Sequence, residues 1–152
     1  VICFARSLQP DITFIPLVED VYVAACRRDQ PLAGRKNLTW QAFYQQDYIS
    51  LDITSGNRNL LDQMLGHIKP ERPGICETRH VTTMLGMVEA GIGIAAVPAM
   101  SMPHAEHSIL TQIPLTEPEV KRTVGLIRRS GRIQSWIAAE LETLITARYR
   151  AA

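Results

Sequence analysis

Residues 74–98, GICETRHVTTMLGMVEAGIGIAAVP, change their hydrophobic period twice and thereby decide the fold. Ile75 and Cys76 open a short strand-like segment. Apolar residues then recur at the i, i+3, i+4, i+7 spacing of a helix with one buried face, at Val81, Met84, Leu85 and Val88. We expect Thr78 and the residues just after it to cap this helix, and Gly91 to end it, because glycine enters the left-handed conformation at little cost.

The residues after Gly91 predict a strand that is covered on both faces. Residues 92–97 are apolar or glycine without alternation, which is typical of strands in parallel sheets. A strand, a helix and a second strand within so short a stretch form a right-handed βαβ unit. The stretch therefore places the chain in the α/β class.

The flanking sequence adds strands and helices of the same class. Strand-like runs lie at residues 1–5, 12–17, 21–26, 48–51, 109–115 and 122–129. Helix patterns lie at residues 37–46, 60–68 and from about 133 onward. Pro16 in the second run predicts an edge strand or a bend. The alternation of strands and helices predicts a sheet covered by helices.

The helix patterns also predict which side chains are buried. Thr39 is expected to cap the first helix, which buries Trp40 and Phe43. The second helix has an apolar face made of Leu60, Leu61, Met64, Leu65 and Ile68. The last helix has an apolar stripe made of Ile133, Ile137, Leu141, Leu144 and Ile145. We expect both sets to face a core.

Composition and charge exclude several classes of protein. A chain of 152 residues can bury one core, in one or two small lobes. The formal net charge of +1 gives no basic field for nucleic acid. Three widely spaced cysteines match no zinc site and suit reduced thiols in the cytoplasm. We see neither a membrane span nor a signal peptide, and a first residue other than Met suggests a piece of a longer protein.

Two predicted helix N-termini follow the carboxyl ends of strands, where open α/β sheets bind ligands. One contains Thr54, Ser55, Gly56 and Asn57, and the other runs from Thr78 through His80 to Thr82. Free backbone N–H groups, the helix dipole and these hydroxyls suit an anion, with Arg58 or Arg79 nearby. The alternative is that Thr54, Ser55 and Thr78 only cap their helices, and the residues alone favour this simpler interpretation.

The sequence gives little support for an enzyme, a metal site or a cofactor. Cys76 and His80 could form a nucleophile–base pair, but a thiol in a buried-strand pattern is usually inert. His104 and His107 have a metal-ligand spacing without a third ligand nearby. The sequence contains no P-loop, dinucleotide fingerprint or serine-hydrolase elbow. We therefore expect no catalytic residues, no bound metal and no cofactor.

Residues 88–98, VEAGIGIAAVP, resemble a signature of the effector-binding domain of LysR-type transcriptional regulators. Further segments follow the order of that family: PLVED before the strand at 21–26, the charged turn after it, and PLAGR at 31–35. The stretch RTVGLIRR at 122–129 and the final helix resemble the end of that domain. The resemblance covers nearly the whole chain.

The resemblance implies a type II periplasmic-binding-protein-like fold with two lobes. Residues 21–118 would be the complete second lobe, residues 1–20 a remnant of the first lobe, and residues 119–152 its return strand and helix. A small effector would bind in the cleft between the lobes. The residues implied for that site are Thr54, Ser55, Gly56, Asn57, Thr78, His80, Thr82, Val97 and Pro98.

The function that the resemblance implies is ligand sensing for a DNA-binding transcriptional regulator in the cytoplasm. DNA would be bound only through an N-terminal helix-turn-helix absent from these residues, and the full-length protein would be a homodimer or tetramer. A ligand would favour one hinge geometry over another. The alternatives are a solute-binding protein or an enzyme, such as a dehydratase, on the same two-lobed fold.

Overall fold

The structure is a computed structural model that describes residues 2–4, 11–68, 70–104, 108–131 and 133–150. Contacts between residues divide the chain into two compact units. One unit is Val21–Val120, and the other consists of Val1–Asp20 with Lys121–Ala152. We call them the 21–120 unit and the flanking unit and describe each by itself.

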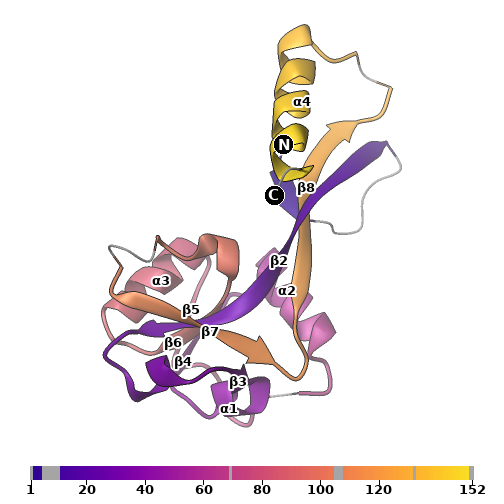
Figure 1. The fold of residues 1–152 in the computed structure, drawn as a ribbon. Coiled ribbons are helices and arrows are strands. Elements are labelled where there is room, and N and C mark those ends of the chain that lie inside the picture. The colour runs from indigo at the N-terminus through magenta and orange to yellow at the C-terminus, as the bar shows by residue number, and fades with distance from the viewer. Residues whose placement is uncertain (1, 5–10, 69, 105–107, 132, 151–152) are drawn as a thin grey trace. The chain divides into compact units, whose positions relative to one another are not determined.

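Eight strands and four helices are formed by the described residues (Figure 1). The strands are β1 (Ile2–Phe4), β2 (Ile12–Arg27), β3 (Leu38–Thr39), β4 (Tyr48–Leu51), β5 (Cys76–Thr78), β6 (Ile94–Pro98), β7 (Leu110–Thr116) and β8 (Lys121–Arg129). The helices are α1 (Trp40–Tyr44), α2 (Gly56–Met64), α3 (Val81–Glu89) and α4 (Trp136–Arg150). Short 3-10 turns lie at Pro31–Gly34 and Ala99–Ser101.

The sheet of the 21–120 unit confirms the parallel arrangement predicted for the central stretch. β4 runs parallel to β5 on one side, with Leu51 opposite Thr78. It runs parallel to β6 on the other side, with Ile49 opposite Ala95. β2 then pairs antiparallel with both β6 and β7. The three parallel strands therefore end at the same edge of the sheet.

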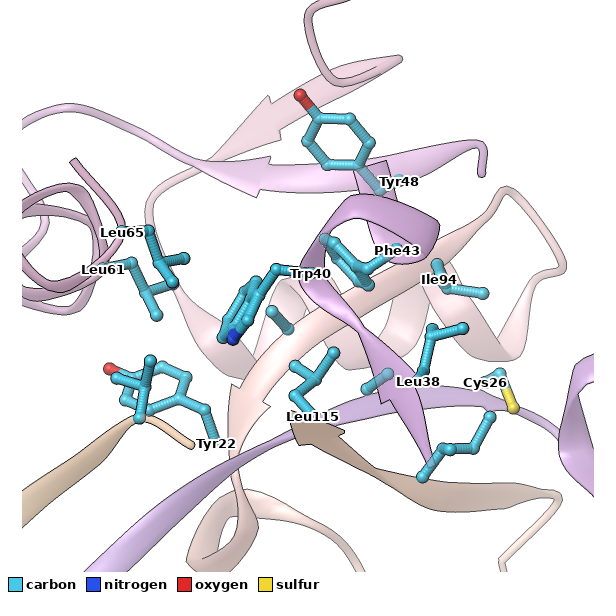
Figure 2. Packing of buried hydrophobic residues seen from close by; sticks show 14 residues of the cluster. Tyr22, Cys26, Leu38, Trp40, Phe43, Tyr48, Leu61, Leu65, Ile94 and Leu115 are labelled. Carbon is cyan, nitrogen blue, oxygen red and sulfur yellow. The ribbon is translucent and has the colours of Figure 1, made fainter. Parts of the chain in front are cut away.

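Two apolar clusters cover the two faces of this sheet. Side chains alternate between the clusters along β2, so that Tyr22 and Ala24 enter one cluster while Val23 and Ala25 enter the other. The first cluster packs against α1 and α2 (Figure 2), and the second packs against α3. Figure 1 shows α1 and α3 on opposite sides of the strands. Burial on both faces explains the unbroken apolar runs in the sequence.

Helices α1 and α3 follow the local patterns closely. Thr39 caps α1 by accepting a hydrogen bond from the Ala42 N–H at 3.2 Å, and Trp40 and Phe43 are buried as predicted. Met84, Leu85 and Val88 form the buried face of α3. Gly91 has φ +80°, the left-handed conformation expected after the end of this helix.

The N-cap position of α3 falls just after Thr78, within the predicted residues, but Thr78 itself is not the cap. Thr78 is the last residue of β5, and His80 occupies the N-cap position in an extended conformation. The strand continues one register position further than the sequence suggested, because Thr78 pairs with Leu51 across the parallel ladder. The N-cap of α3 is therefore His80, two residues after Thr78.

The first half of the chain contains one long strand where the sequence predicted two. β2 runs without interruption for 16 residues. Pro16 lies within it, and its side chain is exposed. Since proline lacks only the N–H donor, a position that does not donate to a neighbouring strand tolerates it without a bend.

Two predicted buried faces are only partly buried. On α2, Leu61 is buried and Leu65 follows it into the core, but Met64 is 45% exposed. The apolar stripe of α4 faces solvent in this chain, with Ile133, Ile137, Leu141 and Leu144 at least half exposed. Helical periodicity identifies the apolar face of a helix. It does not show whether other residues of this chain pack against that face.

Candidate functional site

The two predicted helix N-termini lie next to each other at the edge where the parallel strands end. Leu51 and Thr78 are the last residues of β4 and β5 and are register partners. The N–H of Asp52, just beyond β4, donates to the carbonyl oxygen of Thr78 at 2.9 Å. The loops that lead into α2 and α3 are therefore joined directly, and their side chains share one part of the surface.

The N-terminus of α2 has no side-chain cap among the described residues. Ser55 is its N-cap, with φ −70° and ψ 131°, and its hydroxyl does not bond to the first turn. The first intrahelical bond runs from the Asn59 N–H to the Ser55 carbonyl oxygen at 3.1 Å. The N–H groups of the first turn therefore have no intrahelical acceptor. They form the positive end of the helix dipole.

The N-terminus of α3 is built in the same way. His80 is its N-cap, and within the described part of the chain its side chain bonds to no helical N–H. The Met84 N–H donates to the His80 carbonyl oxygen at 3.0 Å, so the N–H groups of Val81, Thr82 and Thr83 precede the first intrahelical bond. Thr82 and His80 are exposed, while Thr78 is half-buried. Two positive helix ends thus lie beside each other.

The hydroxyl of Thr54 is bound within its own loop. Both the Thr54 N–H and its hydroxyl donate to Asp52 Oδ1, which forms an Asx-type turn ahead of α2. These hydrogen bonds hold the pKa of the Asp52 carboxyl below its ordinary value, and the charge of Arg79 lowers the pKa further. Thr54 therefore shapes the loop and does not cap α2.

Asn57 is oriented by a residue that the sequence did not single out. The hydroxyl of Tyr22 on β2 donates to Asn57 Oδ1 at 2.9 Å. Tyr22 is only 1% exposed, so the first turn of α2 is bonded to a fixed point of the core. No local pattern could reveal this contact, because the two residues are 35 positions apart.

The two arginines expected near an anion differ in their surroundings. Nε of Arg58 donates to both carboxylate oxygens of Asp62 at 2.9 Å, and its Nη1 donates to the Leu51 carbonyl oxygen at 3.3 Å. Glu77 lies 4.0 Å from the same Nη1. Arg58 is therefore held by groups of the protein, whereas Arg79 is exposed.

Val97 and Pro98 mark the end of β6 at the same edge of the sheet. Both residues are buried, and Val97 is 0% exposed within the second apolar cluster. Pro98 is opposite Tyr22 in the antiparallel pairing with β2. The side chain of Val97 is therefore part of the core, while Gly56 at the start of α2 is half-buried.

Features of an enzyme or a metal site are not assembled in the described part of the chain. Cys76 is half-buried on β5, and it makes no hydrogen bond to His80 among these residues. The described residues contain no cluster of three or more histidine, cysteine or acidic side chains able to hold a metal ion. No described helix is both long and apolar enough to cross a membrane.

Comparison with known proteins relates nearly the whole chain to one family. The family described as "LysR substrate binding domain" matches residues 1–149. The Escherichia coli (strain K12) protein named "Uncharacterized HTH-type transcriptional regulator YbhD" is 42% identical over 134 residues, 88% of this chain and 42% of the relative. The transcriptional activator protein LysR of the same strain is 36% identical over 99 residues, 64% of this chain and 31% of the relative. The chain thus spans less than half the length of these relatives.

Solved structures share the fold. The effector-binding domain of QuiR in complex with shikimate has a TM-score of 0.82 and 24% identity, covering 99% of this chain and 71% of that chain. The regulatory domain of Synechocystis PCC6803 CcmR in complex with 2-PG has a TM-score of 0.83 and 21% identity, covering 98% of this chain and 72% of that chain. At these identities the likeness shows the fold alone, and it confirms the predicted type II periplasmic-binding-protein-like class.

Proposed function

This chain belongs to the LysR substrate-binding domain family, and we propose that its 21–120 unit binds a small anionic effector at the N-termini of α2 and α3. The main support is the pair of adjacent helix N-termini that lack side-chain caps in the described part of the chain. Unbonded N–H groups and aligned dipoles favour a carboxylate or a phosphate. Ser55, Gly56, Asn57, Thr78, His80 and Thr82 would surround the anion, with Thr54 holding the loop.

Val97 and Pro98 would support the anion site by holding the end of β6 in place and would not contact the ligand with their side chains. Because both side chains are buried, they would fix the end of β6 beside the two loops and offer backbone groups only. The exposed guanidinium of Arg79 would add attraction, whereas Arg58 is already bonded to Asp62. Shikimate, which the structure of QuiR contains, is itself a carboxylate of suitable size.

We further propose that the full-length protein is a cytoplasmic transcriptional regulator and not an enzyme. The relatives named above are transcriptional regulators, and they supply the argument for DNA binding through a helix-turn-helix. Residues 1–20 and 119–152 would belong to a first lobe, with residues 21–118 as the second. Homodimers or tetramers would present two DNA-binding domains, and effector binding would change their spacing through its differential affinity for two geometries.

The proposal is tested by measuring anion binding to the 152-residue chain by calorimetry and thermal shift, with shikimate and other small carboxylates as probes. A ligand at 100 times its dissociation constant stabilises the native state by about 2.7 kcal/mol. Thr82→Asp places a carboxylate in the first turn of α3, and we expect it to weaken binding by about tenfold or more through repulsion. The same change suits the helix dipole, so stability should be kept.

Gln41→Asp is the matched control, since it adds the same charge to the exposed first turn of α1, away from the site. It should leave anion binding unchanged. Equal binding by the Thr82→Asp variant and the wild type would contradict the proposed site. Ligand-induced amide shifts that avoid Ser55 and Thr82 altogether would contradict it as well.

A further inference from the structure

A cavity of about 430 Å³ lies within the 21–120 unit between α1, α2 and β4. Trp40, Phe43, Tyr44 and Tyr48 form one wall, and the opposite wall comes from the apolar face of α2. Figure 2 shows side chains of α2 projecting toward Trp40. The residues proposed above for the anion do not line this cavity. Its volume lies within the range of pockets that hold small organic ligands.

The size of the cavity argues against a simple packing defect. Protein interiors contain few voids larger than a water molecule. This cavity opens to the surface, so water enters it in the free protein, and its wall is mainly apolar with Ser50, Arg58 and Asp62 at its polar part. A ligand with an apolar body would displace this water and remove the aromatic and aliphatic walls from solvent, which favours binding.

The aromatic wall suits a ring. Tyr44 contacts Phe43 and Tyr48 edge to face, with centroids 5.5 and 5.3 Å apart, and Trp40 lies 6.1 Å from it. Aromatic rings prefer such offset and edge-on neighbours, and a bound ring could extend the same arrangement. The cluster therefore offers edges and faces of rings to the cavity, which suit the stacking of an aromatic ligand.

One polar group in the wall has no partner in the described part of the chain. The Tyr44 hydroxyl forms no hydrogen bond with the described residues and is accessible to water, whereas the Tyr48 hydroxyl donates to the Arg72 carbonyl oxygen at 2.9 Å. Burial raises the pKa of Tyr44 to about 12, with the charges of Tyr48 and Asp62 adding to the effect. Tyr44 stays protonated at neutral pH and can donate to a ligand.

The charges that line the cavity do not attract an anion. Arg58 is bonded to both oxygens of Asp62 and faces Glu77 at 4.0 Å. One positive group is therefore accompanied by two negative groups. A ligand carboxylate entering the cavity would find Arg58 already paired with Asp62 and close to Glu77.

We propose that this cavity is a second small-molecule site, which takes a compact neutral aromatic molecule bearing one hydrogen-bonding group. The inference stands on the cavity walls and on the Tyr44 hydroxyl, and it does not depend on the anion site. The two sites would differ in ligand class, one anionic and one neutral.

The test uses three probes of similar size on the 152-residue chain: p-cresol, toluene and benzoate. We expect p-cresol and toluene to cause saturable NMR shifts of the Leu61 and Leu65 methyl groups, which line the cavity. Benzoate should cause none there. Shifts confined to the exposed apolar residues of α4, the absence of saturation, or equal binding of benzoate in the cavity would overturn the proposal.

Two tyrosine variants test the hydrogen bond. Tyr44→Phe should weaken p-cresol binding by about two- to tenfold and leave toluene unchanged, because a net hydrogen bond is lost. Tyr48→Phe is the matched control, since its hydroxyl is already bonded to Arg72. It should preserve the preference for p-cresol over toluene. An unchanged preference for p-cresol in Tyr44→Phe would overturn the proposal, because the ligand's hydrogen-bonding group would then have no partner in the cavity.

Filling the cavity provides an independent check. Leu65→Trp should abolish the binding of both neutral probes while anion binding at Ser55 and Thr82 is retained. Because the wild-type NMR map locates the ligand without any substitution, a variant that fails to fold does not remove the test. Retained p-cresol binding in a folded Leu65→Trp protein would refute the site.

Discussion

A buried ion pair in the flanking unit allows a stability prediction to be worked out in detail. Asp20 on β2 is 2% exposed. Its Oδ2 accepts hydrogen bonds from Nη2 of Arg122 at 2.8 Å and from Nε at 3.0 Å. The Arg122→Met substitution keeps much of the aliphatic stem but removes both charge-assisted bonds. It leaves a carboxylate in a place from which water is largely excluded.

The size of the effect follows from burial. Removing one partner of a buried pair typically costs about 3–5 kcal/mol. The Arg122 side chain is still 14% exposed, so we expect the lower end, about 3 kcal/mol. For a chain of this size, that loss lowers the melting temperature by roughly 6–12 °C.

The neighbouring pair provides the control. Lys121 Nζ lies 3.6 Å from Glu19 Oε2, and the two side chains are 45% and 65% exposed. Such an exposed pair contributes about 0–1 kcal/mol to stability, so Lys121→Met should change the free energy of unfolding by no more than that.

Urea unfolding followed by far-UV circular dichroism gives the free energy of unfolding of both variants. If Arg122→Met costs no more than Lys121→Met at an equal m-value, the argument from burial is refuted.

Four further predictions concern other parts of the chain. Gly91→Ala should destabilise the protein by about 1–2 kcal/mol because φ is +80° there. Gly86→Ala on the exposed face of α3 should stabilise the protein by about 0.5–1 kcal/mol, because an added Cβ meets nothing within 4 Å. Urea unfolding of both variants tests the loss of stability in the first and the gain in the second. Thr54→Val should reduce stability near neutral pH, because the hydroxyl of Thr54 helps to lower the pKa of Asp52 in the folded state. The difference from wild type should shrink as pH falls below the ordinary Asp52 pKa of 3.8 and be lost once pH passes the lower folded-state pKa. Thermal melts between pH 2 and 7 would contradict this if the difference stayed constant in acid. Leu141→Glu, at a site 55% exposed on α4, should raise the monomer fraction in sedimentation velocity, and an unchanged fraction would exclude this face from self-association.

The elements that sequence reasoning predicted correctly are those determined by neighbouring residues. The apolar spacing in residues 81–88 predicts both the helix α3 and its buried side. Thr39 followed by Trp40 and Phe43 specifies a capped short helix in the same way. Strand β6 was predictable because it has no polar face and is buried along its whole length. In all these cases the deciding information lies within about ten residues.

The details that the sequence could not provide depend on register between distant residues. Tyr22 reaches Asn57, and the Trp40 indole N–H donates to the Pro118 carbonyl oxygen at 2.9 Å across 78 residues. Whether Ser55 caps its own helix is equally invisible, since serine is a good cap in isolation. The exposed stripe of α4 shows the same limit: a period of 3.6 residues predicts an apolar side but no partner for it.

The distribution of charge around α2 determines what each of its two proposed sites can bind. The guanidinium of Arg58 is one turn from the N-terminus of the helix, yet Asp62 and the Leu51 carbonyl oxygen already hold it. Attraction for an anion at Ser55 must therefore come mainly from backbone N–H groups, which are fixed and do not titrate. The same arginine pairing leaves Arg58 neutralised at the cavity beneath α2, and for that reason we expect the cavity to bind acids poorly. In our proposal, the Arg58–Asp62 ion pair thus separates the ligand classes of the two sites on α2.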